Sequence, residues 1–346
     1  MTSTSKSNLS SILTLPATAQ LARSFDPERL IADLNRVTAA SWIEPERYSE
    51  AVVEQKWRIL PLVSIGGSVA AARPGRPGLY DFAKTPLARE APYLTSIIDS
   101  LPGEVRTVRL IRMGPGGRLG EHRDRCGFDY GTLRLHVPIV TNPKAILKIG
   151  GEVHRWQPGS LWYGDFSRRH EAWNDGPSAR VHLLLDTLIT RELLDLFPAE
   201  FTNALSDEDV VFARPRRELS VSEAQAYECS FRMPKSFLEF LPGSLPELRV
   251  DEDEEETESV HLGVMQDRLI LHIGGRPAFG LVALGDGLFR LLAGTEDRLL
   301  KIEPAGRRPM VRLQIRHGSE VRELSVNAIA GNLDSTVRSN LRDVEQ

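Results

Sequence analysis

The chain has 346 residues, of which 43 are basic and 47 are acidic, so its formal charge is -4. With 41% hydrophobic residues it can fill a core in each of two domains. A net charge this small gives no global field that would draw the protein to nucleic acid or to an anionic membrane, so a small or peptidic substrate fits better.

The cysteines and the N-terminus indicate the compartment. Cys126 and Cys229 fall in different candidate domains and form no CxxC or zinc-type spacing, which favours a reducing environment and two free thiols. Residues 1–11 lack the apolar segment of a signal peptide, and no stretch approaches the ~18 apolar residues of a membrane span. We therefore expect a cytoplasmic protein that has no membrane partner.

Helical patterns dominate the start of the chain. Residues 1–20 are polar and are predicted to be disordered. An amphipathic helix is predicted at residues 27–40, with Pro27 in its first turn behind Asp26. Residues 57–65 are predicted to be extended, residues 66–77 form a Gly/Pro-rich loop, and a second helix at residues 86–101 is expected to bend at Pro92. These helices would flank a sheet.

From Glu104 onward the hydrophobic period shortens to two, which is typical of strands. Six short strands between Gly, Pro, Asn or Asp turns are predicted at residues 105–113, 133–140, 145–149, 152–156, 160–166 and 180–189. This density of strands implies a mainly β, double-sheet fold. A jelly roll is the expected architecture, because it manages strand edges and leaves a pocket between its sheets. We assign residues 21–200 to this domain.

The chain changes character twice after residue 190. Helical patterns are predicted at residues 191–197 and 222–241, and seven acidic residues then occupy the eight positions 251–258. Such a run is usually a solvated linker, with docking of a basic partner as the alternative. Residues 201–258 are therefore predicted to be a helical segment and acidic linker. Residues 259–330 alternate again and predict a second, small all-β module, followed by a tail at residues 331–346.

The triplet His122-Arg123-Asp124, followed later by His170, carries the chemistry of this sequence. A His-x-Asp pair at the end of a strand projects two side chains to one face, at a separation that one ion can bridge. Two imidazoles and one carboxylate are the facial ligand set of non-haem Fe(II), which leaves metal positions open for a cosubstrate and O2. The pair alone is a weak signal, because an isolated histidine is more often a satisfied or surface residue. The triple predicts an iron site.

Arg180 begins a predicted strand ten residues past His170. A buried guanidinium is unfavourable unless an anion pairs with it, and its fork suits a dicarboxylate such as 2-oxoglutarate. The alternative partner is Asp165 or Asp186 of the protein itself. Asp165 could instead orient a ligand histidine or serve a turn, and both possibilities stay open.

Four further residues are weighed beside Arg180. Arg134 and His136 share one face of their predicted strand, so both can point into the same cavity. For His136 the alternative is a core imidazole that bonds to the backbone. His182 shares the face of Arg180, either as a supporting residue or merely as a packed one. Asn174 is expected to serve the turn before Gly176.

Two segments contain the motifs HRD, R-L-H-V-P-I, W-Y-x-D-F, a late histidine, N-x-G and R-V-H-L. They are RLIRMGPGGRLGEHRDRCGFDYGTLRLHVPIVTNP and GSLWYGDFSRRHEAWNDGPSARVHLLLD. The region from about Trp57 to Thr190 resembles the aspartyl/asparaginyl β-hydroxylase family, which includes relatives that hydroxylate free proline. Nothing of the resemblance reaches the module after residue 258.

This resemblance implies a double-stranded β-helix (jelly-roll, cupin-like) core with an Fe(II) site. The implied metal ligands are His122, Asp124 and His170. It also implies that Arg180 holds 2-oxoglutarate, with Arg134 and His136 facing the same pocket. Some members of the family lack the carboxylate ligand, whereas this chain retains it at Asp124.

We therefore interpret the chain as an Fe(II)- and 2-oxoglutarate-dependent dioxygenase that releases succinate and CO2. Its substrate would be an amino acid, Asp/Asn or Pro, free or in a peptide. No nucleophile elbow, P-loop or dinucleotide fingerprint is present, which argues against hydrolases, kinases and dehydrogenases. Two alternatives remain: a metal-dependent β-fold enzyme that does not use 2-oxoglutarate, and a non-catalytic ligand-binding protein. The second module could present a peptide or carrier, or mediate a homodimer.

Overall fold

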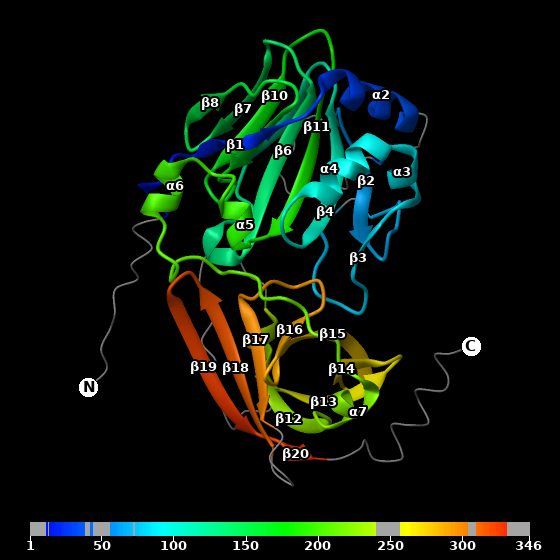
Figure 1. The fold of residues 1–346 in the computed structure, drawn as a ribbon, viewed down its shortest axis with the longest axis vertical. Coiled ribbons are helices and arrows are strands. Elements are labelled where there is room, and N and C mark those ends of the chain that lie inside the picture. The colour runs from blue at the N-terminus through cyan, green and yellow to red at the C-terminus, as the bar shows by residue number, and fades with distance from the viewer. Residues whose placement is uncertain are drawn as a thin grey trace. The chain divides into compact units, whose positions relative to one another are not determined.

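The structure is a computed structural model, and its described residues are 12, 14–38, 42–43, 56–71, 73–239, 257–303 and 309–330 (Figure 1). The chain divides into two units. The first comprises residues 1–75 and 82–213, and the second comprises residues 76–81 and 214–346. The second unit therefore begins well before residue 259 and takes in the segment at 214–258. The predicted acidic run lies mostly outside the described residues, which resume at Thr257.

The first unit contains a seven-stranded sheet with the order β1-β9-β6-β11-β4-β2-β3. Its strands are β1 (Thr18–Ser24), β2 (Trp57–Ile65), β3 (Phe82–Lys84), β4 (Val105–Met113), β6 (Thr132–Val140), β9 (Ser160–Gly164) and β11 (Arg180–Leu188). The central strand β11 is buried at every position because both faces of the sheet are covered. Val181, Leu183 and Leu185 point into the main hydrophobic core. The alternate residues of β11 point to the opposite face.

Helices pack against the core side of this sheet (Figure 1). They are α2 (Pro27–Val37), α3 (Pro86–Glu90) and α4 (Pro92–Ser100), followed by α5 (Arg191–Leu194) and α6 (Ala199–Ala204). Asp26 caps α2 by accepting hydrogen bonds from the amides of Glu28 and Arg29. The predicted second helix is broken into α3 and α4 before Pro92. Buried Asp33 of α2 accepts the first amides of α4, those of Tyr93 and Leu94, at 2.6 and 2.9 Å.

A four-stranded sheet with the order β5-β10-β7-β8 completes the first unit. Its strands are β5 (Gly117–His122), β7 (Ala145–Ile149), β8 (Glu152–His154) and β10 (His170–Asn174), and the short 3-10 helix η1 spans Phe128–Tyr130. A second apolar cluster, which includes Met113, Leu147, Phe166 and Ala172, contains residues of both sheets. Two antiparallel sheets face each other, and the helices cover the other face of the seven-stranded sheet. This arrangement confirms the predicted jelly-roll class.

The second unit is a nine-stranded antiparallel sheet with the order β19-β18-β17-β16-β15-β14-β13-β12-β20. Its strands are β12 (Cys229–Pro234), β13 (Thr257–Met265), β14 (Arg268–Ile273), β15 (Arg276–Gly285), β16 (Leu288–Leu291), β17 (Arg298–Glu303), β18 (Met310–His317), β19 (Glu320–Asn327) and β20 (Ile329–Ala330). Helices α7 (Val221–Gln225) and α8 (Lys235–Leu238) accompany it. The predicted all-β module is confirmed.

Three local predictions were wrong. Residues 222–241 were predicted to be helical, but β12 lies within them, because Cys229, Phe231 and Met233 alternate into the core of the second unit. Residues 18–20, which were predicted to be disordered, begin β1 and pair with β9. Strands β5 and β10 were missed because they are short and carry few apolar residues. None of the helices that the structure describes combines the length and the apolar character needed to span a lipid bilayer.

Candidate active site

Strand pairing brings together three residues that are far apart in the sequence. His122 is the last residue of β5 and His170 is the first of β10, and the two lie directly opposite each other in the antiparallel ladder. Asp124 follows two residues later, where its amide donates a hydrogen bond to the Phe166 carbonyl at 2.9 Å. That bond ties the loop after β5 to the segment before β10. Backbone hydrogen bonds thus fix both segments of the predicted triad, the one that carries His122 and Asp124 and the one that carries His170.

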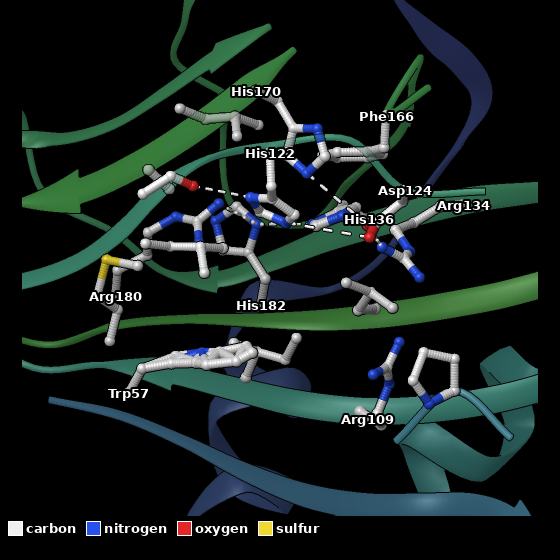
Figure 2. Close-up of a pocket in the computed structure, with 18 of the residues that line it drawn as sticks. Trp57, Arg109, His122, Asp124, Arg134, His136, Phe166, His170, Arg180 and His182 are labelled. Carbon is white, nitrogen blue, oxygen red and sulfur yellow. Dashed lines mark hydrogen bonds and ion pairs between the residues drawn. The ribbon is translucent and has the colours of Figure 1, made fainter. Parts of the chain in front are cut away.

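The ligand atoms of His122, Asp124 and His170 lie within 4.8 Å of one another. The Nε2 atom of His122 is 4.0 Å from Oδ1 of Asp124, and that of His170 is 3.7 Å from Oδ2 (Figure 2). The Nδ1 atoms are 2.8 and 3.0 Å from the carbonyls of Gly120 and Arg168. A proton on Nδ1 that is held by a carbonyl leaves Nε2 as the ligating atom. Two such imidazoles and one carboxylate fit Fe(II).

The electrostatics of the site keep His170 and Asp124 in the forms that bind metal. Burial, together with the nearby His122, lowers the pKa of His170 to about 4, so its imidazole is neutral near pH 7. Burial alone would raise the pKa of Asp124, but Arg134 and the two histidines outweigh it and hold that pKa below its usual range. A divalent ion therefore displaces no proton from His170 or Asp124 at neutral pH.

Arg134 links the metal ligand to a buried ion-pair network. Its guanidinium is hydrogen-bonded to Asp124, and its Nε donates to Asp186 at 2.8 Å. Asp186 also accepts from Arg109 at 3.1 Å and from the Thr107 hydroxyl at 2.7 Å. Its side chain is 6% exposed, and the two arginines hold its pKa far below the usual range despite burial. Arg134 thus faces the cavity, as predicted, and its contacts there orient Asp124.

Asp186→Asn should destabilise the first unit by about 3–5 kcal/mol, because it leaves two buried guanidiniums without their shared carboxylate. Loss of this support should also weaken metal binding about 10–100-fold, as is usual when an outer partner of a ligand is removed. Urea unfolding and metal titration measure the two effects. Asp175→Asn is the control, because Asp175 pairs with Arg118 in an exposed salt bridge and should change stability by less than about 1 kcal/mol. Equal stability of the two variants would contradict this account of the network.

Arg180 lies on the same face of β11 as His182 and Asp186. It is 6% exposed, and within the described parts of the chain it forms no ion pair with a carboxylate. Its guanidinium donates a hydrogen bond from Nη2 to Nδ1 of His182, at 3.1 Å. Burial lowers its pKa to about 10, which leaves it charged. The alternative of an ion pair with Asp165 or Asp186 is thereby removed, because Asp186 pairs with Arg109 and Arg134 while Asp165 pairs with Arg168.

Two residues of uncertain role are now placed in turns. Asp165 accepts hydrogen bonds from the amide and hydroxyl of Ser167 and from Arg168, so it does not orient a ligand histidine. Asn174 accepts from the Gly176 amide at 3.1 Å and donates to the Ser178 carbonyl at 2.8 Å. A Cβ at Gly176 would collide with the side chain of Asn142, which explains the glycine of the N-x-G motif.

A cavity of about 330 Å³ lies over the triad (Figure 2). Its charged and histidine side chains are those of Arg109, His122, Arg123, Asp124, Arg134, His136, His170, Arg180 and His182. Its apolar wall includes Trp57, Ile111, Met113, Leu119, Leu147 and Leu184. All six predicted site residues therefore line one cavity. Sequence reasoning missed Arg109 and Trp57, although alternation along β4 and the position of Trp57 at the start of β2 could have suggested them.

His136 and His182 are buried on adjacent strands, and their titration should make stability depend on pH. Burial and the nearby Arg180 hold both pKa values well below the ordinary value of 6.5. Below about pH 6.5 the two histidines are protonated in the unfolded chain but stay neutral in the folded protein. The free energy of unfolding should therefore fall by about 1.4 kcal/mol per pH unit for each histidine as the pH decreases. Urea unfolding between pH 7 and 5.5 measures this slope. In His182→Asn the slope should lose the contribution of one histidine, about 1.4 kcal/mol per pH unit. An unchanged slope would contradict the prediction.

Residues 26–189 match the family described as Aspartyl/Asparaginyl beta-hydroxylase. Ornithine lipid ester-linked acyl 2-hydroxylase of Rhizobium tropici is 31% identical over 101 residues, which cover 28% of this chain and 34% of that protein. L-proline cis-4-hydroxylase of Rhizobium meliloti (strain 1021) is 27% identical over 142 residues, which cover 39% and 48%. This chain thus spans less than half the length of either relative. The resemblance inferred from the sequence is confirmed for residues 26–189.

Two solved structures show weaker similarity. An oxidoreductase of the 2OG-Fe(II) oxygenase family from Burkholderia pseudomallei is 16% identical, with coverage of 50% of this chain and 84% of that chain and a TM-score of 0.33. A Pseudomonas putida prolyl-4-hydroxylase is 14% identical, with coverage of 51% and 95% and a TM-score of 0.34. Similarity at this level carries no inference about activity.

Proposed function

We propose that the first unit is an Fe(II)- and 2-oxoglutarate-dependent dioxygenase that hydroxylates an amino-acid substrate. The observation that carries this proposal is the presence of two complementary groups in one cavity. These are the triad of His122, Asp124 and His170, and the buried Arg180, which forms no ion pair with a carboxylate of the described chain. The match of residues 26–189 to a hydroxylase family supports the same conclusion.

The triad would hold the metal through Nε2 of each histidine and one carboxylate oxygen of Asp124. When bound, Fe(II) supplies the oxidation of an unactivated C–H bond by O2, with 2-oxoglutarate converted to succinate and CO2. The backbone carbonyls of Gly120 and Arg168 fix both imidazoles, and Arg134 fixes Asp124. The ligand geometry is therefore largely set before anything binds.

Arg180 would neutralise the distal carboxylate of 2-oxoglutarate. A guanidinium in an apolar wall binds a carboxylate more strongly than an exposed one, because water does not compete for its N–H donors. Trp57, Ile111 and Met113 line the same cavity and give it an apolar wall. The cavity thus places an apolar wall and a cationic group in the same space as the triad.

The proposed substrate is built on an amino acid. One relative named above is a hydroxylase of L-proline, and its name supports this class. The other is named as a hydroxylase of the ester-linked acyl group of ornithine lipid, so its name does not support hydroxylation of the amino acid itself. A cavity of about 330 Å³ is large enough for a cosubstrate and a small side chain. Three further points stay predictions. The substrate is an amino acid that is free or part of a peptide, and the protein is cytoplasmic. The second unit presents the substrate or forms a homodimer.

The test is anaerobic loading with Fe(II), followed by addition of O2 and 2-oxoglutarate with panels of free amino acids and of Asp-, Asn- or Pro-containing peptides. Succinate and hydroxylated product should appear in equal amounts. Turnover that persists without 2-oxoglutarate would favour the alternative of a metal-dependent β-fold enzyme that does not use 2-oxoglutarate. Iron binding without succinate for any panel would favour a non-catalytic ligand-binding protein.

A further inference from the structure

Five aromatic side chains form a continuous path of ring contacts that starts at the metal site. The ring of Phe166 lies 4.9 Å from that of His170 and 5.0 Å from that of His136, as measured between centroids (Figure 2). The ring of Trp156 lies 5.3 Å from that of His136 and stacks on Trp162 at 5.4 Å, with 11° between the indole planes. His170 and Trp156 are buried, whereas Trp162 is partly exposed. The path therefore joins a candidate metal ligand to a ring that solvent reaches.

The indole of Trp156 is buried at a cost that packing does not explain. Trp156 lies between β8 and β9 and is 5% exposed, and its Nε1 has no hydrogen-bond partner in the described parts of the chain. Buried tryptophans usually find a partner for this N–H, and an unpaired one costs about 1–3 kcal/mol. The side chain does not line the cavity, so a molecule bound there would not supply the partner. A phenylalanine would fill the position without this penalty, which indicates a role for the indole other than packing.

Ease of one-electron oxidation distinguishes an indole from a phenyl or imidazole ring. Two nearly parallel indoles share the positive charge that is left when one of them loses an electron. Trp162 also donates a hydrogen bond from Nε1 to Oγ of Ser160 at 2.7 Å, and such a bond is stronger when its donor is charged. Electron transfer weakens steeply with distance, and no step of the path exceeds 5.4 Å between ring centroids. The stacked pair is thus the point of the path from which an electron is most easily removed.

The chemistry proposed for the metal site needs a source of electrons when no substrate is bound. One oxygen atom of O2 enters succinate with two electrons from 2-oxoglutarate, and the other normally takes two electrons from the C–H bond of the substrate. Without that bond, the missing pair of electrons is taken from the protein. Oxidation of His170 or of the neighbouring Phe166 would damage the site itself.

We propose that Trp156 and Trp162 form an electron-transfer path that protects the metal site when O2 reacts there without substrate. Trp156 gives an electron to the oxidised metal centre across the rings of His136 and Phe166, and Trp162 then returns an electron to Trp156. A small-molecule reductant such as ascorbate reduces Trp162, and two such passages with two protons from solvent convert the second oxygen atom to water. Without a reductant, Trp162 loses both electrons itself, adds the oxygen of a water molecule to its ring and releases two protons. The proposal rests on the proposed function, which supplies the oxidant.

Peptide mass spectrometry after reaction without substrate tests the path. The full chain, loaded with Fe(II) and given O2 and 2-oxoglutarate but no ascorbate, should gain oxygen mainly at Trp162, and ascorbate should suppress this gain. In Trp156→Phe, which keeps a ring in place but removes the easily oxidised one, Trp162 should lose most of its oxidation. Oxidation should then move to Phe166 and His170, and iron should be released sooner. The control is Trp173→Phe, because Trp173 lies on the same strand as His170 but is not part of the path; it should change neither result.

The outcomes separate this proposal from the proposed function. Asp124→Ala, which should not hold iron, measures the background from oxidants that diffuse through solution. Above that background, a wild type without oxidation at Trp162, or equal oxidation of Trp162 in the wild type and Trp156→Phe, would overturn the path. If Trp156→Phe does not fold, Trp162→Phe replaces it, and oxidation should then stop at Trp156. If the wild type forms no succinate, the proposed function fails, and H2O2, whose reduction to water also takes two electrons, replaces O2 and 2-oxoglutarate as the oxidant in the same comparison.

Discussion

Asp124→Ala is expected to abolish stable binding of Fe(II) and to reduce turnover by at least about a thousandfold, because two neutral imidazoles alone hold a divalent ion weakly. The carboxylate is the one charged ligand of the triad, and its loss leaves the metal next to the cation Arg134. Metal titration under anaerobic conditions measures the affinity, and succinate release measures turnover. The fold should survive, because Arg134 keeps its second partner, Asp186.

The control for this variant is Asp175→Ala, which removes an exposed carboxylate at the end of the same sheet. It should leave metal affinity and turnover unchanged. Asp124→Asn should fall between the two, because an amide oxygen can still ligate but brings no charge. If Asp124→Ala retained full turnover, the two histidines would suffice and the role assigned to Asp124 would be wrong.

The candidate site could be located from the sequence because its residues follow local patterns. His122 and Asp124 are two positions apart, so one short motif reports both, and Arg180 begins a strand whose period of two places Arg180 and His182 on one face. The long apolar strands β4, β6 and β11 were predicted almost to their bounds for the same reason. The relation of His170 to the triad rested largely on the family resemblance, since no local pattern links β10 to β5.

The features that could not be predicted depend on contacts between distant segments. Asp186 was a candidate partner of Arg180 in the sequence, but the register of β11 against β6 and β4 pairs it with Arg134 and Arg109 instead. Strand register is set by the whole sheet and by its bulges, so side-chain alternation alone cannot assign such partners. Strand β12 was taken for part of a helix because a segment of six residues carries too little periodicity to decide.

Arg180→Met is expected to weaken the binding of 2-oxoglutarate by at least about a hundredfold, because it removes a bidentate, buried charge-assisted pair. The free protein should be as stable as the wild type or more stable. The wild-type guanidinium is buried and has no carboxylate partner among the residues that the structure describes, and an apolar side chain of similar length removes that desolvation penalty. Affinity measured by calorimetry and stability measured by urea unfolding should therefore move in opposite directions.

The opposite signs distinguish this role of Arg180 from a structural one. Arg134→Met, the matched substitution at another guanidinium of the same cavity, removes the partner of two carboxylates and should lose stability as well as metal affinity. Arg180→Lys should bind 2-oxoglutarate with intermediate affinity, because it keeps the charge but lacks the planar fork. If Arg180→Met instead unfolded the protein while its turnover per folded molecule stayed intact, Arg180 would be a core residue and the cavity would belong to a metal enzyme that does not need 2-oxoglutarate.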